Sequence, residues 1–459
     1  MLSSTITFFS KFFSGKKYNK LYFILSVSAI LIFITAPSNF AIPSFARQTN
    51  LPCSSCHYTF PALTQFGRMF KLNGYTLTNV ETLETVSPDS SRTTLKIPST
   101  FSFSAFVKSS YTSISKSATG IDKSFVQSPE EMSLFFSGAI SPKIGGYAQL
   151  TYGLSDGAIG LDMLDIRYAN RTTLGSKELI YGLTLNSMPT MQDLWNTTPA
   201  WGFPYYGSES APAPTAATLI QSLEGAAGLG VYALFDKLIY AEVTGYHSSP
   251  AGIAYPPDTT WEMNIKGISP YWRLAIQHQW RRQYLEVGTY GLSSSLYPEG
   301  VSGSTDNYTD IGVDAQFENI GNNGGSWVFH TTYITEKQNL DATFADGGSA
   351  NASDKVNYFK IDGTYNFPDW VSLSAGFFSI SGTSDAGLYA PEEISGSMSG
   401  EPNSSGEILQ VTFLPWMNTQ IGIQYILYGK FNGASSNYDG FGRNAADNNT
   451  LYVMAWLVF

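Results

Sequence analysis

The sequence predicts a mainly β protein, a sixteen-stranded antiparallel transmembrane β-barrel, and three observations lead there. Charged residues are 14% of the 459, against about 25% in soluble domains. After residue 46 no apolar stretch approaches the roughly 20 residues of a membrane-spanning helix. Apolar and polar residues alternate instead, as in Leu164-Asp165-Ile166-Arg167-Tyr168. This period of two is typical of strands with an apolar and a polar face. A periplasmic β-sandwich or propeller is the alternative, although no blade-length repeat supports a propeller.

The N-terminus has the features of an export signal. Four lysines, the last at Lys20, precede an apolar run at positions 21–36, and Ser44-Phe45-Ala46 offers a small-x-small cleavage site. The run is shorter than the roughly 20 residues that cross a bilayer, so an uncleaved anchor is the weaker alternative. Cleavage after Ala46 removes four of the 26 Lys and Arg and none of the 36 Asp and Glu, leaving 22 − 36 = −14. This acidic balance argues against nucleic acid as a partner.

Sixteen candidate strands follow the leader, an even number within the range of bacterial barrels. They begin near Thr100, Met132, Ile144, Leu161, Glu178, Ala226, Leu238, Tyr271, Tyr284, Tyr308, Ser326, Val356, Val371, Ile408, Thr419 and Leu451. Connections such as 141–143, 236–237, 281–282 and 367–369 are tight, whereas most of those after odd-numbered strands are long. Porins place short turns in the periplasm and long loops outside. We therefore expect the first strand to run outward and residues 47 to about 97 to lie at the periplasmic mouth or in the bore.

The last strand, positions 451–459, ends the chain on Phe459. This resembles the C-terminal strand by which outer-membrane barrels are recognised for assembly, although any buried terminal strand could end in this way. Its even-numbered positions are not polar, which departs from a simple wet lumen. We expect another part of the chain to pack against them.

The only two cysteines lie in one pentapeptide, Cys53-Ser54-Ser55-Cys56-His57, with the spacing used for covalent attachment of a c-type haem. Two thiols three positions apart can each bond to a vinyl group of one porphyrin, and the adjacent imidazole is then the proximal ligand of the iron. A disulfide and a zinc site are the alternatives. Zinc would need further ligands, and a disulfide gives no reason for His57 to follow. We expect one covalent haem c, with thioethers at Cys53 and Cys56.

Between leader and barrel, positions 61–74 predict one helix, with proline in its first turn and Asn-Gly past its end. Leu63, Phe66 and Phe70 recur at helical spacing, so this face either covers a porphyrin or packs on the barrel. Roughly fifty residues cannot bury a haem alone. The barrel wall is therefore expected to complete the pocket.

The sixth iron ligand has two candidates. Met69 lies on the predicted helix, and its thioether would raise the reduction potential of the haem; the alternative role for Met69 is packing. His330 shares a strand face with Thr332, which we expect to point into the lumen. His247 and His278 are expected at the rim or on the lipid face.

Arg47, Arg68 and Lys71 are the cations nearest to the cysteines in sequence. Their charges suit the haem propionates. A basic patch at the barrel mouth is the equally weighted alternative.

Residues 45–50, 53–57, 66–68 and 71–75 together resemble the N-terminal region of the fused monohaem cytochrome-porins of iron-oxidising bacteria, and residues 183–206 resemble another segment of that family. The resemblance covers the whole architecture of leader, haem segment and barrel. It implies oxidation of extracellular iron(II), with the electron passed through the outer membrane to a periplasmic carrier. The haem-binding residues of the CxxCH motif carry over directly, whereas no motif for an iron site can be matched.

We therefore expect a signal peptide at 1–46, a monohaem cytochrome c segment at 47–97 in the lumen, and an outer-membrane barrel at 98–459, surrounded by lipid. Three functions are compatible with this organisation. The first is oxidation of extracellular iron(II), with a periplasmic cytochrome or another carrier as acceptor. The second is the same conduit for another donor or acceptor. The third is a diffusion porin with a haem-bearing plug.

Overall fold

The computed structural model describes residues 44–77, 82–83, 97–98, 102–117, 119–120, 122–153, 159–198, 206–223, 225–249, 264–368 and 370–459. The chain divides into two units, 1–42 and 43–459. The first unit, and with it most of the predicted leader, lies outside the described residues, as does the predicted strand start at Thr100. The description below concerns the second unit.

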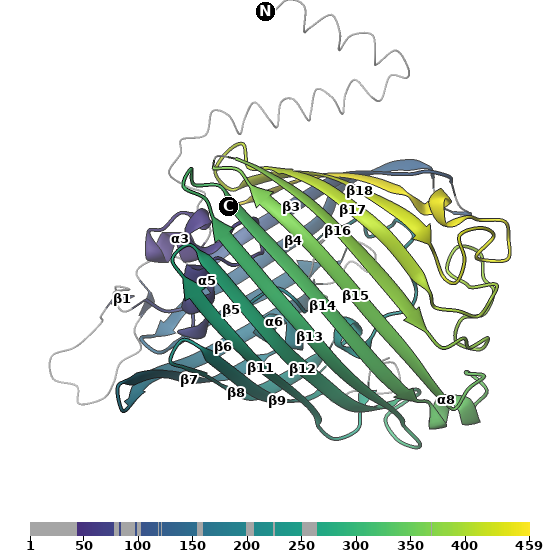
Figure 1. The fold of residues 1–459 in the computed structure, drawn as a ribbon, viewed down its shortest axis with the longest axis horizontal. Coiled ribbons are helices and arrows are strands. Elements are labelled where there is room, and N and C mark those ends of the chain that lie inside the picture. The colour runs from purple at the N-terminus through teal and green to yellow at the C-terminus, as the bar shows by residue number, and fades with distance from the viewer. Residues whose placement is uncertain are drawn as a thin grey trace, which may run out of the picture. The chain divides into compact units, whose positions relative to one another are not determined.

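Sixteen long antiparallel strands form one closed barrel, which confirms the predicted fold (Figure 1). They are β3 (Phe103–Ile114), β4 (Ser124–Ser141), β5 (Ile144–Tyr152), β6 (Ile159–Leu174), β7 (Lys177–Asn186), β8 (Ala226–Phe235), β9 (Ile239–Ser248), β11 (Ser269–Trp280), β12 (Gln283–Tyr297), β13 (Asp306–Ile320), β14 (Ser326–Asn339), β15 (Ser353–Asn366), β16 (Val371–Gly382), β17 (Ser404–Phe413), β18 (Thr419–Lys430) and β19 (Thr450–Val458). Each pairs with the next, and β19 pairs with β3 to close the sheet. The two-residue β10 (Asn264–Ile265) extends the ladder beside β12, and β1 (Thr82–Leu83) pairs with β2 (Ile97–Pro98).

Seven short helices accompany the strands in the described residues. They are α3 (Ser44–Thr49), α4 (Cys53–Cys56), α5 (Gln65–Leu72), α6 (Pro189–Gln192), α7 (Leu219–Ser222), α8 (Asp341–Ala345) and the 3₁₀ helix η2 (Ala445–Asn448). None of the described helices has the length and apolar character needed to cross a membrane.

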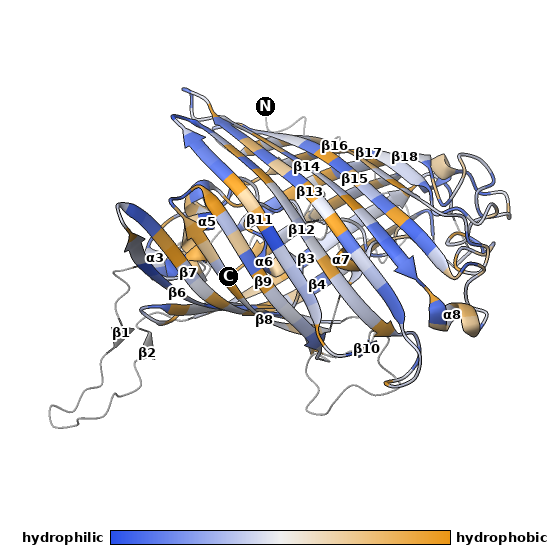
Figure 2. Ribbon diagram, turned by 60° about the horizontal axis from the view of Figure 1, so that its bottom comes forward, coloured by the Kyte–Doolittle hydropathy of each residue, from blue (hydrophilic) through white to orange (hydrophobic). Residues whose placement is uncertain are grey.

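The outer face of the barrel is apolar, and Figure 2 shows apolar residues recurring along the strands. Exposed outward side chains include Leu183, Leu185, Leu229, Val231, Leu274, Ile276, Val287, Ile311 and Val313. Trp280, Trp327, Trp370 and Trp416 are also exposed, near the short turns, as in the aromatic girdles of membrane barrels. A closed barrel satisfies its backbone hydrogen bonds internally, and this outer surface suits lipid. The fold is that of a transmembrane β-barrel.

Turn length alternates around the barrel. The turns 142–143, 175–176, 236–238, 281–282 and 321–325 lie at one end, and the long connections lie at the other. In Figure 1, α3 and α5 lie at the short-turn end and α8 at the long-loop end. By the pattern of outer-membrane barrels we expect the short-turn end to face the periplasm.

Two predicted boundaries were wrong. Strand β4 begins at Ser124 and not near Met132, because a register shift between Lys108 and Ser110 accommodates Pro129 within the strand. The predicted helix 61–74 is shorter, since α5 begins only after Thr64, whose hydroxyl caps it by accepting from the Gly67 amide at 3.1 Å.

The inward positions of β19 are occupied, as its apolar pattern predicted. Tyr452 donates a 2.6 Å hydrogen bond to Glu130 across the lumen wall. The Trp456 ring lies 5.8 Å from the ring of Phe60, which belongs to the N-terminal segment. The segment at 44–77 therefore packs against the inside of the barrel.

Candidate functional site

The CxxC sequence forms one helical turn, α4, at the short-turn end of the barrel. Because Cys53 and Cys56 are three positions apart on a helix, their side chains lie on the same side. Cys53 is exposed and Cys56 is half-buried, and both thiols are free. Burial raises the pKa of Cys53, and burial together with the charge of Cys53 raises the pKa of Cys56 to about 11. Both thiols are free and lie on one side of the turn, as attachment to the two vinyl groups of one porphyrin requires.

His57 ends this turn in an extended conformation. Its Nδ1 lies 3.1 Å from the Pro61 carbonyl oxygen. A carbonyl can only accept, so Nδ1 carries the proton and Nε2 offers its lone pair, the arrangement usual for a metal-bound histidine. Burial lowers the pKa of His57 to about 4, which keeps the imidazole neutral. The residues of the motif thus fit a c-type haem.

Helix α5 is pressed against α4 at Gly67. A Cβ at this position would lie 2.2 Å from the carbonyl oxygen of Cys56, well inside van der Waals contact. The Thr64 amide also donates to this carbonyl at 2.8 Å, and the Thr64 hydroxyl donates to the Ser55 carbonyl at 2.6 Å. Glycine is therefore required for the two helices to form one compact support for the motif.

An apolar surface surrounds the motif, partly from the segment and partly from the wall. Phe60 is 40% exposed and Phe66 is 41% exposed although both belong to a segment inside the barrel mouth. The Phe60 ring lies 5.0 Å from the His57 ring. On the wall, the Trp456 ring also lies 5.7 Å from the ring of Phe106, which extends the apolar surface. Exposed aromatic rings beside a haem-attachment motif are suited to contact a porphyrin.

The segment is anchored to the wall by Glu318 on β13. Arg68 of α5 forms a buried ion pair with Glu318, and Tyr58 donates to the same carboxylate at 2.8 Å. The Arg68 guanidinium also lies over the Tyr284 ring, 4.2 Å from its centroid. The neighbouring Thr59 donates to the side-chain oxygen of Asn366, at the end of β15, at 2.8 Å.

The other two predicted propionate partners also have protein partners. Lys71 donates to the Asp193 carbonyl at 2.9 Å, and Arg47 donates to the Phe103 carbonyl. Burial lowers the pKa of Lys71 to about 8. All three cations hold the segment in the mouth, and their role toward propionates stays a prediction.

The two candidates for the sixth ligand differ in setting. Met69 packs at the edge of a cluster that contains Leu72 and Trp195. His330 faces the lumen and is 6% exposed, with Nδ1 3.1 Å from Asp362. Its Nε2 has no hydrogen-bond partner among the described residues and is enclosed by protein. His247 and His278 lie on the outer face, as predicted.

A second part of the chain enters the bore: the connection between β7 and β8, described at 187–198 and 206–223. Asp193 accepts from the amides of Trp195, Thr197 and Thr198 at 2.8 to 2.9 Å and lies 3.8 Å from Arg273 of β11. Burial would raise the pKa of Asp193, but Arg273 and these amides hold it below its ordinary value.

This inward connection is hydrogen-bonded to strands in different parts of the barrel wall. The amides of Leu219 and Ile220 donate to Glu336 and Asp310 on β14 and β13. Gln410 of β17 donates to the Tyr206 hydroxyl at 2.8 Å. The connection therefore crosses the lumen beyond the N-terminal segment.

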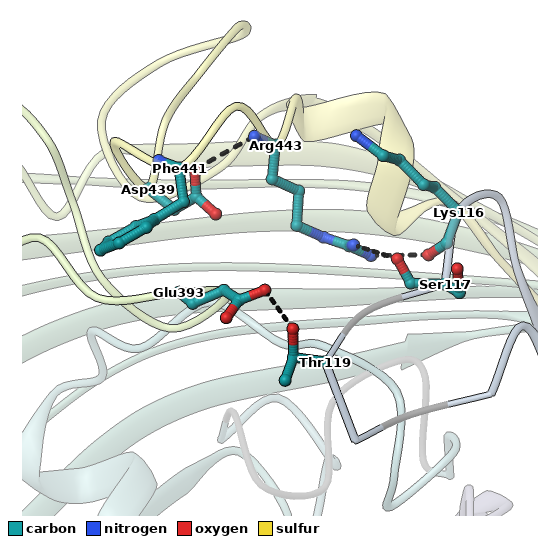
Figure 3. A pocket seen from close by; sticks show the side chains of 7 residues that line it. All are labelled: Lys116, Ser117, Thr119, Glu393, Asp439, Phe441 and Arg443. Carbon is teal, nitrogen blue, oxygen red and sulfur yellow. Dashed lines mark hydrogen bonds between the residues drawn. The ribbon is translucent and has the colours of Figure 1, made fainter.

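At the long-loop end a polar pocket lies between the connections after β3, β16 and β18 (Figure 3). Arg443 donates to the carbonyl oxygens of Ser117 and Lys116, both at 2.9 Å. Thr119 donates to Glu393 on the facing loop. The charged groups bind the loops to each other, and the pocket is separate from the CxxCH motif.

Sequence reasoning missed Glu318, Tyr284 and the inward connection. A partial signal exists for Glu318, because Asp310, Asp314, Gln316 and Glu318 alternate along one strand face. That pattern marks a polar lumen side chain but says nothing about its partner.

Comparisons with known proteins add a fold likeness. No family model and no curated protein matches the chain. Among solved structures, the outer-membrane channel DcaP of Acinetobacter baumannii is 11% identical, with a TM-score of 0.43, covering 78% of this chain and 96% of that one. Salmonella typhi OmpF, in a complex with daunomycin, is 10% identical, with a TM-score of 0.46 and coverage of 78% and 97%. In-vitro folded OmpT of Vibrio cholerae is 9% identical, with a TM-score of 0.43 and coverage of 78% and 96%. Our fold assignment rests on the strand pairing itself.

Proposed function

We propose that the chain is an outer-membrane electron conduit that carries one covalent haem c at Cys53 and Cys56 and takes electrons from extracellular iron(II). The observation that carries this proposal is the haem-attachment motif, held inside the mouth of a closed membrane barrel by Arg68, Lys71 and Tyr58. A bound haem supplies reversible one-electron chemistry at its iron. The choice of iron(II) as donor follows the sequence resemblance described above.

The residues of the chain have distinct tasks in this proposal. His57 offers Nε2 to the iron, because its Nδ1 is held by the Pro61 carbonyl. Phe60 and Trp456 exclude water from one side of the motif. Glu318 and Arg68 fix the distance between motif and wall. The connection through the bore, anchored by Asp193 and Arg273, hinders passage of solutes, so that an electron would cross and the ferric product would stay outside.

A diffusion porin with a haem-bearing plug is the second candidate, and the sixteen-stranded barrel itself favours it. In the lumen near β3, the side chain of Glu209 is 59% exposed although it lies beside Lys108. Conductance in planar bilayers separates the candidates. A conduit conducts poorly when intact and opens after deletion of residues 47–95, whereas a full-size conductance in the intact protein would favour the porin.

The proposal is tested first by staining denaturing gels for haem peroxidase activity. The intact chain should stain, and the variant with Cys53→Ala and Cys56→Ala should not. Donor dependence is then tested on intact cells. Added iron(II) should reduce the haem, whereas an equal concentration of magnesium should leave it oxidised. Staining that persists in the double variant would exclude covalent attachment, and absence of iron-dependent reduction would exclude the donor.

A further inference from the structure

The short-turn end carries a basic rim on one side of the barrel mouth. We define it as Lys143, Arg171, Lys177, Lys237, Arg281 and Arg282, all of them exposed. Only two acids, Glu178 and Asp236, stand among these turns. The local balance is 6 − 2 = +4, in a chain whose formal net charge is −10. These turns therefore carry a local excess of positive charge, although Glu178 and Asp236 form ion pairs with three of the six cations.

The rim occupies only half of the mouth. Its members lie in or beside the turns that join β4 to β5, β6 to β7, β8 to β9 and β11 to β12. Beyond it, the turn 321–325 reads Gly-Asn-Asn-Gly-Gly and the turn 414–418 reads Leu-Pro-Trp-Met-Asn, both without charge, and the sequence 367–370 between β15 and β16 contains one aspartate and no cation. Lipid headgroups surround a barrel on every side, so a contact with lipid alone would not favour one half.

The rim is also joined to the candidate haem segment. Arg171 donates from Nε and Nη2 to the Asn73 side-chain oxygen, at 3.1 and 2.7 Å, where α5 ends. Gln65 at the start of α5 contacts Gln279, two residues before Arg281. Both ends of α5 thus lie beside the rim, and Cys53 of the neighbouring α4 is exposed.

We infer that the basic rim is the docking surface for a soluble periplasmic one-electron carrier protein with an acidic face. This inference rests on the proposed function, and it adds the surface and the charge of the acceptor. A positive patch around a redox group steers an acidic partner into productive orientation and raises the association rate by about 10- to 1000-fold at low salt. In each encounter a haem held at Cys53 and Cys56 would give up one electron, and the carrier would accept it.

The test uses the full-length holoprotein in zwitterionic nanodiscs, reduced beforehand, with a soluble acidic c-type cytochrome as the acceptor probe. The variant Arg281→Gln with Arg282→Gln removes two positive charges from the rim. The variant Trp416→Glu with Met417→Glu changes the net charge by the same amount in the turn 414–418, outside the rim. We expect the first to reduce the bimolecular rate about threefold to tenfold at low ionic strength and to flatten its salt dependence. The matched variant should leave the rate within twofold.

Three outcomes overturn the inference. The first is an equal loss of rate in both double variants, because net charge alone would then explain it. The second is an unchanged rate in the rim variant. The third is a rim variant that alters only the stability of the barrel in phosphatidylglycerol bilayers, which would assign the rim to lipid. Haem staining separates these outcomes from failure of the proposed function: a chain without haem contradicts the conduit, whereas a haem-loaded chain with a charge-independent rate contradicts only the rim.

Discussion

Replacing Glu318 with Gln should release the N-terminal segment from the barrel mouth. Glu318 is 2% exposed and receives both the Arg68 guanidinium and the Tyr58 hydroxyl. Glutamine keeps the shape of the side chain but removes its charge. Arg68, itself 3% exposed, would then be a buried cation without a carboxylate.

The size of the effect follows from the burial of the pair. Removal of one partner from a buried ion pair costs about 3 to 5 kcal/mol. At about 1.4 kcal/mol per tenfold change, the undocked population of the segment rises between roughly 10²- and 10⁴-fold. The cation over the Tyr284 ring and the 2.9 Å bond from Arg68 to the Leu63 carbonyl persist, so the lower half of this range is expected.

A second substitution makes the test specific, because it should restore docking of the segment and not weaken it further. Arg68→Met added to Glu318→Gln removes the unpaired charge, and an apolar replacement of a buried ion pair is often close to neutral. The double variant should therefore dock better than Glu318→Gln alone. Limited proteolysis of the folded barrel measures docking, since cleavage in the segment tracks its undocked population.

Glu336→Gln is the matched control, because that buried carboxylate of the adjacent strand contacts the Leu219 amide and not the N-terminal segment. It should leave the cleavage rate of the segment unchanged. The reasoning is refuted if Glu318→Gln leaves cleavage unchanged, or if adding Arg68→Met makes cleavage faster still.

Three further predictions concern other parts of the molecule. Gly67→Ala should abolish most haem staining, because the new Cβ would stand 2.2 Å from a carbonyl oxygen of the CxxC turn, whereas Gly207→Ala, with its nearest neighbour at 3.9 Å, should not. An impermeant thiol reagent on intact cells should modify Ser395→Cys in a long loop and spare Lys237→Cys in a short turn; the reverse pattern would invert the barrel. Burial would raise the pKa of Asp385, but four backbone amides hold it below its ordinary value. Its contribution to loop stability is therefore complete above the ordinary pKa of 3.8 and is lost as the pH falls below it, so protease resistance of the long loops should decline there, and Asp385→Asn should remove that dependence.

The sequence by itself determined the elements that depend on local pattern. Period-two alternation identified sixteen strands, because successive side chains of a strand point to opposite faces whatever lies beyond them. The CxxCH motif likewise predicts a chemistry from local sequence, since the two thiols and the imidazole are within five residues of each other. Alternating turn lengths assigned the N-terminal segment to the short-turn end before any contact was known.

Boundaries were less certain where two local signals compete. Proline at position 61 suggested the start of a helix, but the Thr64 side chain caps α5 three residues later. The predicted start of the second strand near Met132 left Pro129 outside it, yet a register shift and the 2.9 Å pair between Lys108 and Glu131 keep this stretch in β4.

Only the tertiary structure decided what fills the lumen. Arg68 meets Glu318 across 250 positions of sequence, and Leu219 meets Glu336 across 117. Such contacts depend on barrel closure, which brings β13, β14 and β19 around the same space. Local periodicity assigns a side chain to the inner face but does not select which of sixteen facing strands supplies its partner. Each buried charge loses its hydration and gains a protein partner only when the barrel closes. These pairings therefore depend on the whole barrel and not on any single segment.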